Sequence, residues 1–243
     1  MSVQRQQVLT VARLSYGSAN TDLEKGIDEM RTYRAAALLT AATAILAAST
    51  AVTPSFAGTA TTWTVTPGGN AVAKSGVIRL TDTKTKKAGV CASSTVDGNL
   101  KAGSGLSGTR IGSVTAATFR TCTGPAKVPF TVKASDLPWT ISFASYDPAT
   151  GVVRGTVSGI RVVITATAET TCSAVVSGTA GSTADGVIGA AYTDGTGTLK
   201  FLATGGNLHF WHVKNCAPLL NNADRATLSG TYTITPRQDI TSP

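Results

Sequence analysis

The sequence has few charged residues, few aromatic residues and only two histidines. Charged side chains make up 14% of the 243 residues and aromatic ones 6%, and Glu169 is the only glutamate after residue 57. The heptads of a coiled coil, the repeated glycine of a collagen and the several long apolar runs of a polytopic membrane protein are all missing. The hydrophobic fraction of 42% still suffices for a core, which argues against intrinsic disorder.

The one long apolar run lies between residues 30 and 57 and has the pattern of a secretory signal peptide. Arg31 and Arg34 form a cationic start, residues 35–52 carry no charge, and small residues precede a cleavage point after Ala57. The alternative is a permanent membrane anchor, but the run is only weakly hydrophobic. We therefore expect a protein that is secreted, extracellular or at the cell surface.

Three segments follow from this pattern. Residues 1–29 are polar, and we expect them to be a mis-assigned or disordered extension. We expect residues 30–57 to be the signal peptide and residues 58–243 to form a single secreted β domain. Removal of residues 1–57 takes away five basic and four acidic residues, so the mature chain keeps 16 basic and 9 acidic residues and a net charge of +7.

All four cysteines, Cys91, Cys122, Cys172 and Cys216, lie in the mature chain. An even number in an exported protein predicts two structural disulfides, whereas gaps of 31, 50 and 44 residues do not supply the close pairs of a zinc site. Four cysteines allow three connectivities. A weak internal repeat, in which each half has a phenylalanine shortly before its second cysteine, favours Cys91–Cys122 and Cys172–Cys216.

The mature chain predicts an all-β fold. Threonine supplies 33 of its 186 residues, and apolar and polar side chains alternate along residues 128–133, 139–144 and 225–234. Turn signals recur between such runs, among them Asp97-Gly98, Gly124-Pro125, Asp147-Pro148 and Asp194-Gly195. We expect an antiparallel β-sandwich or a closed barrel of roughly ten to twelve strands.

Residues typical of catalysis are present but not in a catalytic pattern. His209 and His212 are three apart, so on a regular strand they face opposite sides and cannot share a ligand. No serine lies in a Gly-x-Ser-x-Gly elbow. Asp136, Asp147, Asp185 and Asp194 mostly stand beside proline or glycine, where they are expected to cap turns. We assign no catalytic residue, no metal ligand and no cofactor.

Two features favour binding. The cluster Lys84-Thr85-Lys86-Lys87 predicts a hairpin tip or edge strand, or a contact with anionic wall polymer or a membrane surface. No aromatic residues lie within it, which argues against nucleic acid as a partner. The candidate ligand contacts are Trp211, His209, Phe210 and Trp139, with Phe143 as a further wall of a hydrophobic cavity.

Six short segments are typical of one group of proteins: residues 63–69 (WTVTPGG), 105–108 (GLSG), 121–125 (TCTGP), 137–139 (LPW), 205–209 (GGNLH) and 229–233 (SGTYT). On these segments the chain from 58 to 243 resembles small secreted actinomycete proteins with four cysteines and no assigned function. Its layout is also distantly similar to secreted activators of alkane oxidation. Because the segments consist of turns and core residues, the resemblance implies a fold and no chemistry.

The sequence therefore predicts a secreted, non-enzymatic β protein with a binding or structural role at the cell envelope. A carrier or helper for hydrophobic small molecules is the first alternative, and an extracellular hydrolase is the second. The oligomeric state is left open.

Overall fold

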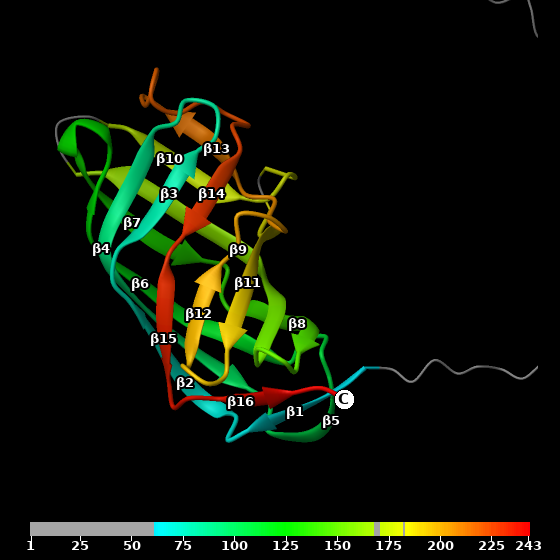
Figure 1. Cartoon of the computed structure of the whole chain (residues 1–243). Helices are drawn as coiled ribbons and strands as arrows, with labels where there is room; N and C mark the ends of the chain where they lie inside the picture. Colours follow the sequence, from blue (N-terminus) through cyan, green and yellow to red (C-terminus); the bar gives the residue numbers. More distant parts are fainter. Residues whose placement is uncertain (1–60, 168–170, 182) are drawn as a thin grey trace, which may run out of the picture. The chain divides into compact units, whose positions relative to one another are not determined.

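The computed structural model describes residues 61–167, 171–181 and 183–243, which are all-β (Figure 1). Residues 1–57, with the expected extension and signal peptide, lie outside the described residues. The described residues belong to one compact unit. None of their helices is long and apolar enough to cross a membrane.

The described residues form sixteen strands in two antiparallel sheets, and one 3-10 turn, η1 (Pro125–Lys127). The small sheet consists of β1 (Thr62–Thr66), β5 (Gly103–Ser107) and β16 (Asp239–Thr241). The large sheet consists of β2 (Gly69–Ser75), β3 (Ile78–Asp82), β4 (Ala88–Leu100), β6 (Gly112–Thr123), β7 (Pro129–Ser135), β8 (Trp139–Asp147), β9 (Val152–Ala166), β10 (Ser173–Ser177), β11 (Gly186–Thr193), β12 (Thr198–Phe201), β13 (His209–Lys214), β14 (Ala226–Ser229) and β15 (Thr231–Thr235).

The large sheet closes on itself. Its path from β4 through β2, β15, β12, β11, β9 and β7 reaches β6, and β6 pairs with β4 again. β8 continues the position of β7, because it also pairs with both β6 and β9. At one end β14 and β3 extend β4, β13 and β10 extend β9, and a bridge between His209 and Arg225 joins the two extensions. Apolar side chains on the inner faces of this closed sheet form hydrophobic clusters, as the facing walls of a β-sandwich do.

The number of strands exceeds the expected ten to twelve, because a run of residues predicted as one strand can pair with different neighbouring strands along its length. The run 225–234 was expected as one strand, but it divides at Gly230 into β14, which pairs with β3, and β15, which pairs with β2 and β12. A side chain at Gly230 would collide with Ile78, so the crowded change of partner requires glycine.

One predicted turn is wrong. Asp97-Gly98 lies inside the thirteen-residue strand β4, at a bulge where the register with β6 shifts. A Cβ at Gly98 would lie 2.8 Å from the carbonyl oxygen of Ser113, so this glycine allows a close approach of two strands. The predicted turns at Asp147-Pro148 and Asp194-Gly195 are confirmed: the first joins β8 to β9, and the second joins β11 to β12.

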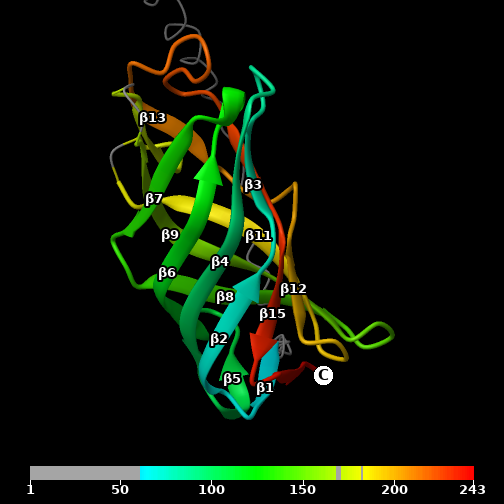
Figure 2. The same cartoon turned by 90° about the vertical axis from the view of Figure 1, so that its left-hand side faces the viewer.

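The two ends of the unit differ (Figures 1 and 2). At what we call the sealed end, the small sheet packs Trp63, Val65 and Ile240 against Ile111 and Tyr192. At the opposite end, which we call the mouth, three loops gather: the β3–β4 turn (83–87), the β6–β7 turn (124–128) and the β13–β14 loop (215–225).

Both disulfides lie towards the mouth, and the favoured connectivity is confirmed. Cys91 on β4 bonds to Cys122, its direct partner on β6. Cys172 and Cys216 stand just outside the paired strands β10 and β13 and join their ends. The covalent bonds therefore brace the wall at the end where the three loops gather.

Candidate functional site

The closed sheet surrounds a cavity of about 390 Å³. Its wall is almost entirely apolar, and every side of the sheet contributes to it. Representative wall residues are Val96 on β4, Phe119 on β6, Val132 on β7, Ile164 on β9, Phe201 on β12 and Leu228 on β14. A cavity of this size and polarity is within the range of small-molecule binding sites.

The side chains of the wall show that the interior is not filled. Leu80, Val96, Phe130 and Val132 point inward and pack against the core cluster, yet they are only half-buried. Protein interiors normally pack as densely as organic crystals and leave few voids larger than a water molecule. Apolar side chains that are only half-buried while facing inward indicate unfilled space in the interior.

The cavity opens at the mouth. Four residues of its lining are exposed, and three of them, Lys87, Asn215 and Ala217, belong to the loops of the mouth or to the end of one. Pro125, Val128 and Leu219 complete the lining there with half-buried side chains. The entrance thus lies among the β3–β4 turn, the β6–β7 turn and the β13–β14 loop.

Hydrogen bonds hold two of these loops together. Within the β3–β4 turn, Oδ1 of Asp82 accepts from the backbone N–H groups of Lys84 and Thr85 at 2.8 and 3.0 Å. The Thr85 hydroxyl then donates to the carbonyl of Leu219 at 3.0 Å. The second oxygen of Asp82, Oδ2, is buried without a hydrogen-bond partner among the described residues.

An ion pair also joins the β3–β4 turn to the β13–β14 loop. The exposed ammonium of Lys84 lies 3.4 Å from Asp224, which is 5% exposed. The amide of Asn221 donates to Asp224, and with Lys84 it keeps the pKa of that carboxyl below its usual range. The β3–β4 turn and the β13–β14 loop therefore form one side of the entrance as a connected pair.

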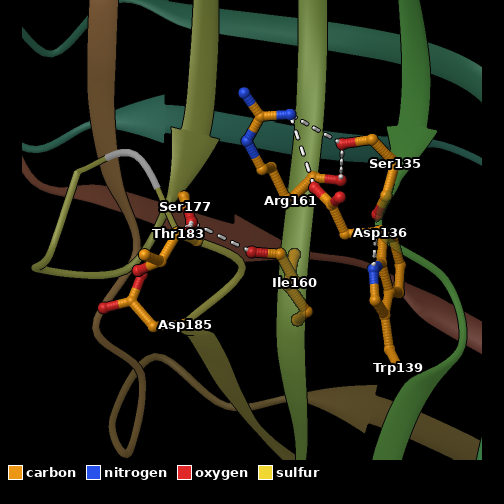
Figure 3. A network of polar contacts seen from close by, with 8 residues as sticks. All are labelled: Ser135, Asp136, Trp139, Ile160, Arg161, Ser177, Thr183 and Asp185. Carbon is orange, nitrogen blue, oxygen red and sulfur yellow. Dashed lines mark hydrogen bonds and ion pairs between the residues drawn. The ribbon is translucent and has the colours of Figure 1, made fainter.

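A polar network behind the wall positions Trp139 (Figure 3). The Trp139 indole donates to the carbonyl of Ser135 at 3.0 Å, and the Arg161 guanidinium reaches both the Ser135 hydroxyl, at 3.2 Å, and Asp136, at 3.4 Å. Because these contacts satisfy the indole N–H, the rest of the ring lies against the core as part of the cavity wall.

The same network continues to Ser177. Its hydroxyl lies within hydrogen-bond distance of the carbonyls of Ile160 and Thr183 and of Asp185. Burial would raise the pKa of Asp185, but hydrogen bonds from Ala180 N–H and Ser177 lower it. Ser177 is fully buried and shares its hydroxyl with backbone carbonyls, so it ties the β10–β11 turn to β9.

The four candidate ligand contacts separate into two pairs. Trp139 and Phe210 line the cavity. Trp211 and His209 lie outside its lining: the Trp211 indole donates to the carbonyl of Gly178 at 2.7 Å, and the His209 ring contacts the carbonyl of Asn207. Neighbouring residues on β13 alternate in direction, so Phe210 inside implies Trp211 outside. Phe143 also lies elsewhere, at the sealed end, where its ring is tilted against that of Trp63 with 5.0 Å between the ring centroids.

Strict alternation holds on β13 from His209 to Trp211 and ends at His212, so it does not separate the two histidines as expected. His212 has a φ of 49° and lies where the register with β10 shifts. Among the residues that the structure describes, no three His, Cys, Asp or Glu side chains form a group able to hold a metal ion.

The aspartates serve turns and ion pairs. Asp147 accepts from the N–H of Ala149 and from the Thr150 hydroxyl at the β8–β9 turn, which lowers its pKa. Asp185 caps residues 178–180, and Asp136 pairs with Arg161. Asp194 differs, because burial raises its pKa to about 6 and one of its oxygens has no partner among the described residues.

Most of the cavity wall was not assigned from the sequence. The sequence signal for the wall was the alternation of apolar and polar residues. Val128, Phe130 and Val132 were expected on one face, and all three line the cavity. Leu80, Val96 and Leu228 have the same kind of position, but alternation identifies only an inward face. It does not distinguish a filled interior from a hollow one.

Comparisons of the chain with family models, curated proteins and solved structures find no match. The resemblance to secreted actinomycete proteins therefore stays a prediction.

Proposed function

We propose that this protein is a non-enzymatic carrier that binds a hydrophobic small molecule inside its closed β-sheet. The observation that carries this proposal is the apolar cavity of about 390 Å³, open at the mouth and lined by half-buried side chains that face inward. Burial of a ligand there would remove apolar surface of both partners from water.

The architecture supports binding without a large rearrangement. The wall is a continuous hydrogen-bonded ring, and Cys91–Cys122 and Cys172–Cys216 fix it near the entrance. A preformed site loses little conformational entropy when a ligand enters. Two disulfides are compatible with an oxidising compartment, and we propose that the carrier works outside the cytosol, as the signal-peptide pattern predicts.

The cavity favours the carrier over the two other roles expected from the sequence, a hydrolase and an envelope-binding protein. Ser177 lies opposite His209 on the neighbouring strand, but its hydroxyl contacts the carbonyls of Ile160 and Thr183 and the carboxylate of Asp185, while the His209 ring contacts the carbonyl of Asn207. Among the described residues, no hydrogen bond joins the serine hydroxyl to the histidine ring, and a serine hydrolase needs that bond. Contact with anionic envelope polymers stays a prediction that no feature of the cavity requires.

Titration calorimetry of the full chain with decan-1-ol tests the proposal. We expect saturable binding with one ligand per chain and a negative heat-capacity change, because apolar surface is buried. Ala73→Phe would place a ring in the cavity, since Ala73 lines it, and should weaken binding at least tenfold. Val72→Phe on the same strand is the matched control, because Val72 is absent from the lining. Full-chain protein that binds no decanol would refute the carrier.

A further inference from the structure

The entrance of the cavity carries lysines on each of its three loops. Lys84, Lys86 and Lys87 lie on or beside the β3–β4 turn, Lys127 lies in η1, and Lys214 ends β13 just before the β13–β14 loop. All five are exposed, and Lys87 itself lines the cavity. Lys84 pairs with Asp224, which leaves four ammonium groups without an ion pair among the described residues.

The described acidic residues near this entrance, Asp82 and Asp224, offset only part of the charge of its five lysines. Asp82 and Asp224 are both buried beneath the β3–β4 turn, and their hydrogen bonds point to backbone N–H groups, Asn221 and Lys84. The surface that an approaching ligand meets is therefore positive, whereas the space behind it is apolar. This combination matches a molecule with one anionic end and one apolar end.

The volume of the cavity limits the apolar end. A methylene group occupies about the volume of one water molecule in the liquid, roughly 30 Å³. A cavity of about 390 Å³ therefore takes a chain of about a dozen carbons. A longer chain would have to leave some methylenes outside the entrance, where they gain nothing from the apolar wall.

We propose that the ligand is a single-chain amphiphile with an anionic head group, of the fatty-acid class, whose tail of about a dozen carbons fills the cavity while its carboxylate lies among the lysines of the entrance. This inference rests on the proposed carrier function and specifies its ligand. Lys87 and Lys127 are the expected head-group contacts, because one lines the cavity and the other lies between two lining segments.

The two ends of the ligand have separable effects on affinity. Each methylene that enters the apolar cavity should tighten binding about fourfold, which corresponds to the ~0.8 kcal/mol of a buried CH₂. Each exposed lysine should contribute only about two- to fivefold at low salt, because exposed ion pairs are weak and screened. Chain length therefore sets most of the affinity, and the lysines set the preference for an anion.

Calorimetric titration of the full chain with hexanoate, octanoate, decanoate, dodecanoate and hexadecanoate tests the chain. We expect the dissociation constant to fall about fourfold per added methylene and then to level off near twelve carbons. A dependence that continues unchanged to hexadecanoate would overturn the assigned chain length.

The head group is tested with decanoate, decan-1-ol and decyltrimethylammonium at low and high salt. We expect decanoate to bind about tenfold more tightly than decanol in 20 mM NaCl, the cation to bind most weakly, and the differences to shrink in 0.5 M NaCl. The double variant K87Q/K127Q should weaken the binding of decanoate much more than the binding of decanol, and so remove most of the preference for the anion. K133Q is the control, because Lys133 is exposed on β7 and outside the cavity lining.

The outcomes separate the two proposals. Equal affinity for decanoate and decanol, unaffected by K87Q/K127Q, would overturn the anionic head group and leave the carrier intact. Absence of binding by every alkyl compound would overturn both.

Discussion

The mouth and the sealed end are built from the same kinds of residue, but they are stabilised in different ways. At the sealed end Trp63 and Ile111 are 2% and 0% exposed, and the side chain of Gln238 is fully buried. At the mouth, inward-facing apolar side chains remain half-buried, and disulfides join the strands instead. Where the interior is kept open, covalent bonds take over part of the stabilisation that dense packing provides elsewhere.

At the sealed end, the buried Gln238 has hydrogen-bond partners for its side chain and its backbone. The side chain of Gln238 accepts from Gly68 N–H at 2.9 Å and donates to the Pro236 carbonyl, while its backbone N–H and C=O both bond to the Tyr192 hydroxyl. A buried amide with satisfied hydrogen bonds costs little and fixes geometry. Among the described residues, each end also buries one carboxylate oxygen without a partner: Oδ2 of Asp82 at the mouth and Oδ1 of Asp194 at the sealed end.

The largest expected effect is that of Trp63→Ala at the sealed end. The variant removes a buried ring that packs against the ring of Phe143, so it should lower the free energy of unfolding by about 3–5 kcal/mol. Urea unfolding followed by far-UV circular dichroism measures this loss. Because Trp63 is not itself part of the cavity lining, the folded fraction should still bind decanol. A loss below about 1 kcal/mol would contradict the dense packing of this end.

Removal of a disulfide should be nearly as costly at the mouth. The bridges close loops with sequence separations of 31 and 44 residues, and on the chain-entropy model each contributes about 3–4 kcal/mol. Cys172→Ser/Cys216→Ser should therefore lower the midpoint of urea unfolding and, unlike Trp63→Ala, also weaken decanol binding by the folded protein. Unchanged affinity in this variant would show that the bridge does not shape the entrance.

A matched pair of valines compares packing directly. Val65→Ala should cost about 2–3 kcal/mol, because Val65 is 1% exposed in the sealed cluster and its loss leaves a void. Val132→Ala should cost less than about 1 kcal/mol, because Val132 already borders open space. Thermal and urea unfolding of both variants give the two values, and equal losses would remove the distinction between the ends.

The smallest expected effect depends on pH and concerns Asp194 at the sealed end. Burial, and then Asp239, raise the pKa of Asp194 from 3.8 to about 6 in the folded protein. Below pH 3.8 the carboxyl is protonated in both states and the effect vanishes. Between pH 4 and 6 the folded state binds the proton more tightly, so stability falls as pH rises and the loss is complete above about pH 6.

Asp194→Asn should therefore stabilise the protein by about 1 kcal/mol at pH 8 and by nothing at pH 3.5, after allowance for solvent screening of this partly exposed group. Urea midpoints of both proteins across this range measure the difference. Asp97→Asn is the control, because Asp97 is exposed on β4. A gain that is independent of pH would mean that the carboxyl titrates normally.

The all-β fold and the disulfide connectivity could be predicted because they depend on local and countable features. Alternation placed Val128, Phe130 and Val132 on one face, and an internal repeat of cysteines paired Cys91 with Cys122. The predictions failed where a strand departs from regular geometry. Gly98 sits in a bulge rather than a turn, and His212 interrupts the alternation of β13.

The cavity itself could not be predicted, because its volume depends on how side chains from strands far apart in sequence meet across the ring. Phe210 and Trp211 show the difficulty. Both looked suited to a pocket, but the direction of β13 places one inside and the other against Gly181 on the outside. The lysines at 84–87 were expected at a hairpin tip or edge strand, or in contact with an anionic partner, whereas their position at an entrance depends on the closed sheet.

The described chain begins and finishes at the same place. Thr62 and Ser242 are joined by a hydrogen bond of 2.8 Å between the Ser242 hydroxyl and the Thr62 carbonyl, and both belong to the sealed end. An attachment through either terminus, to a resin, a fusion partner or a sensor surface, would therefore leave the entrance directed towards the surrounding solution. The ends are also close enough for a short peptide to join them in a circularly permuted variant with new termini in an exposed turn.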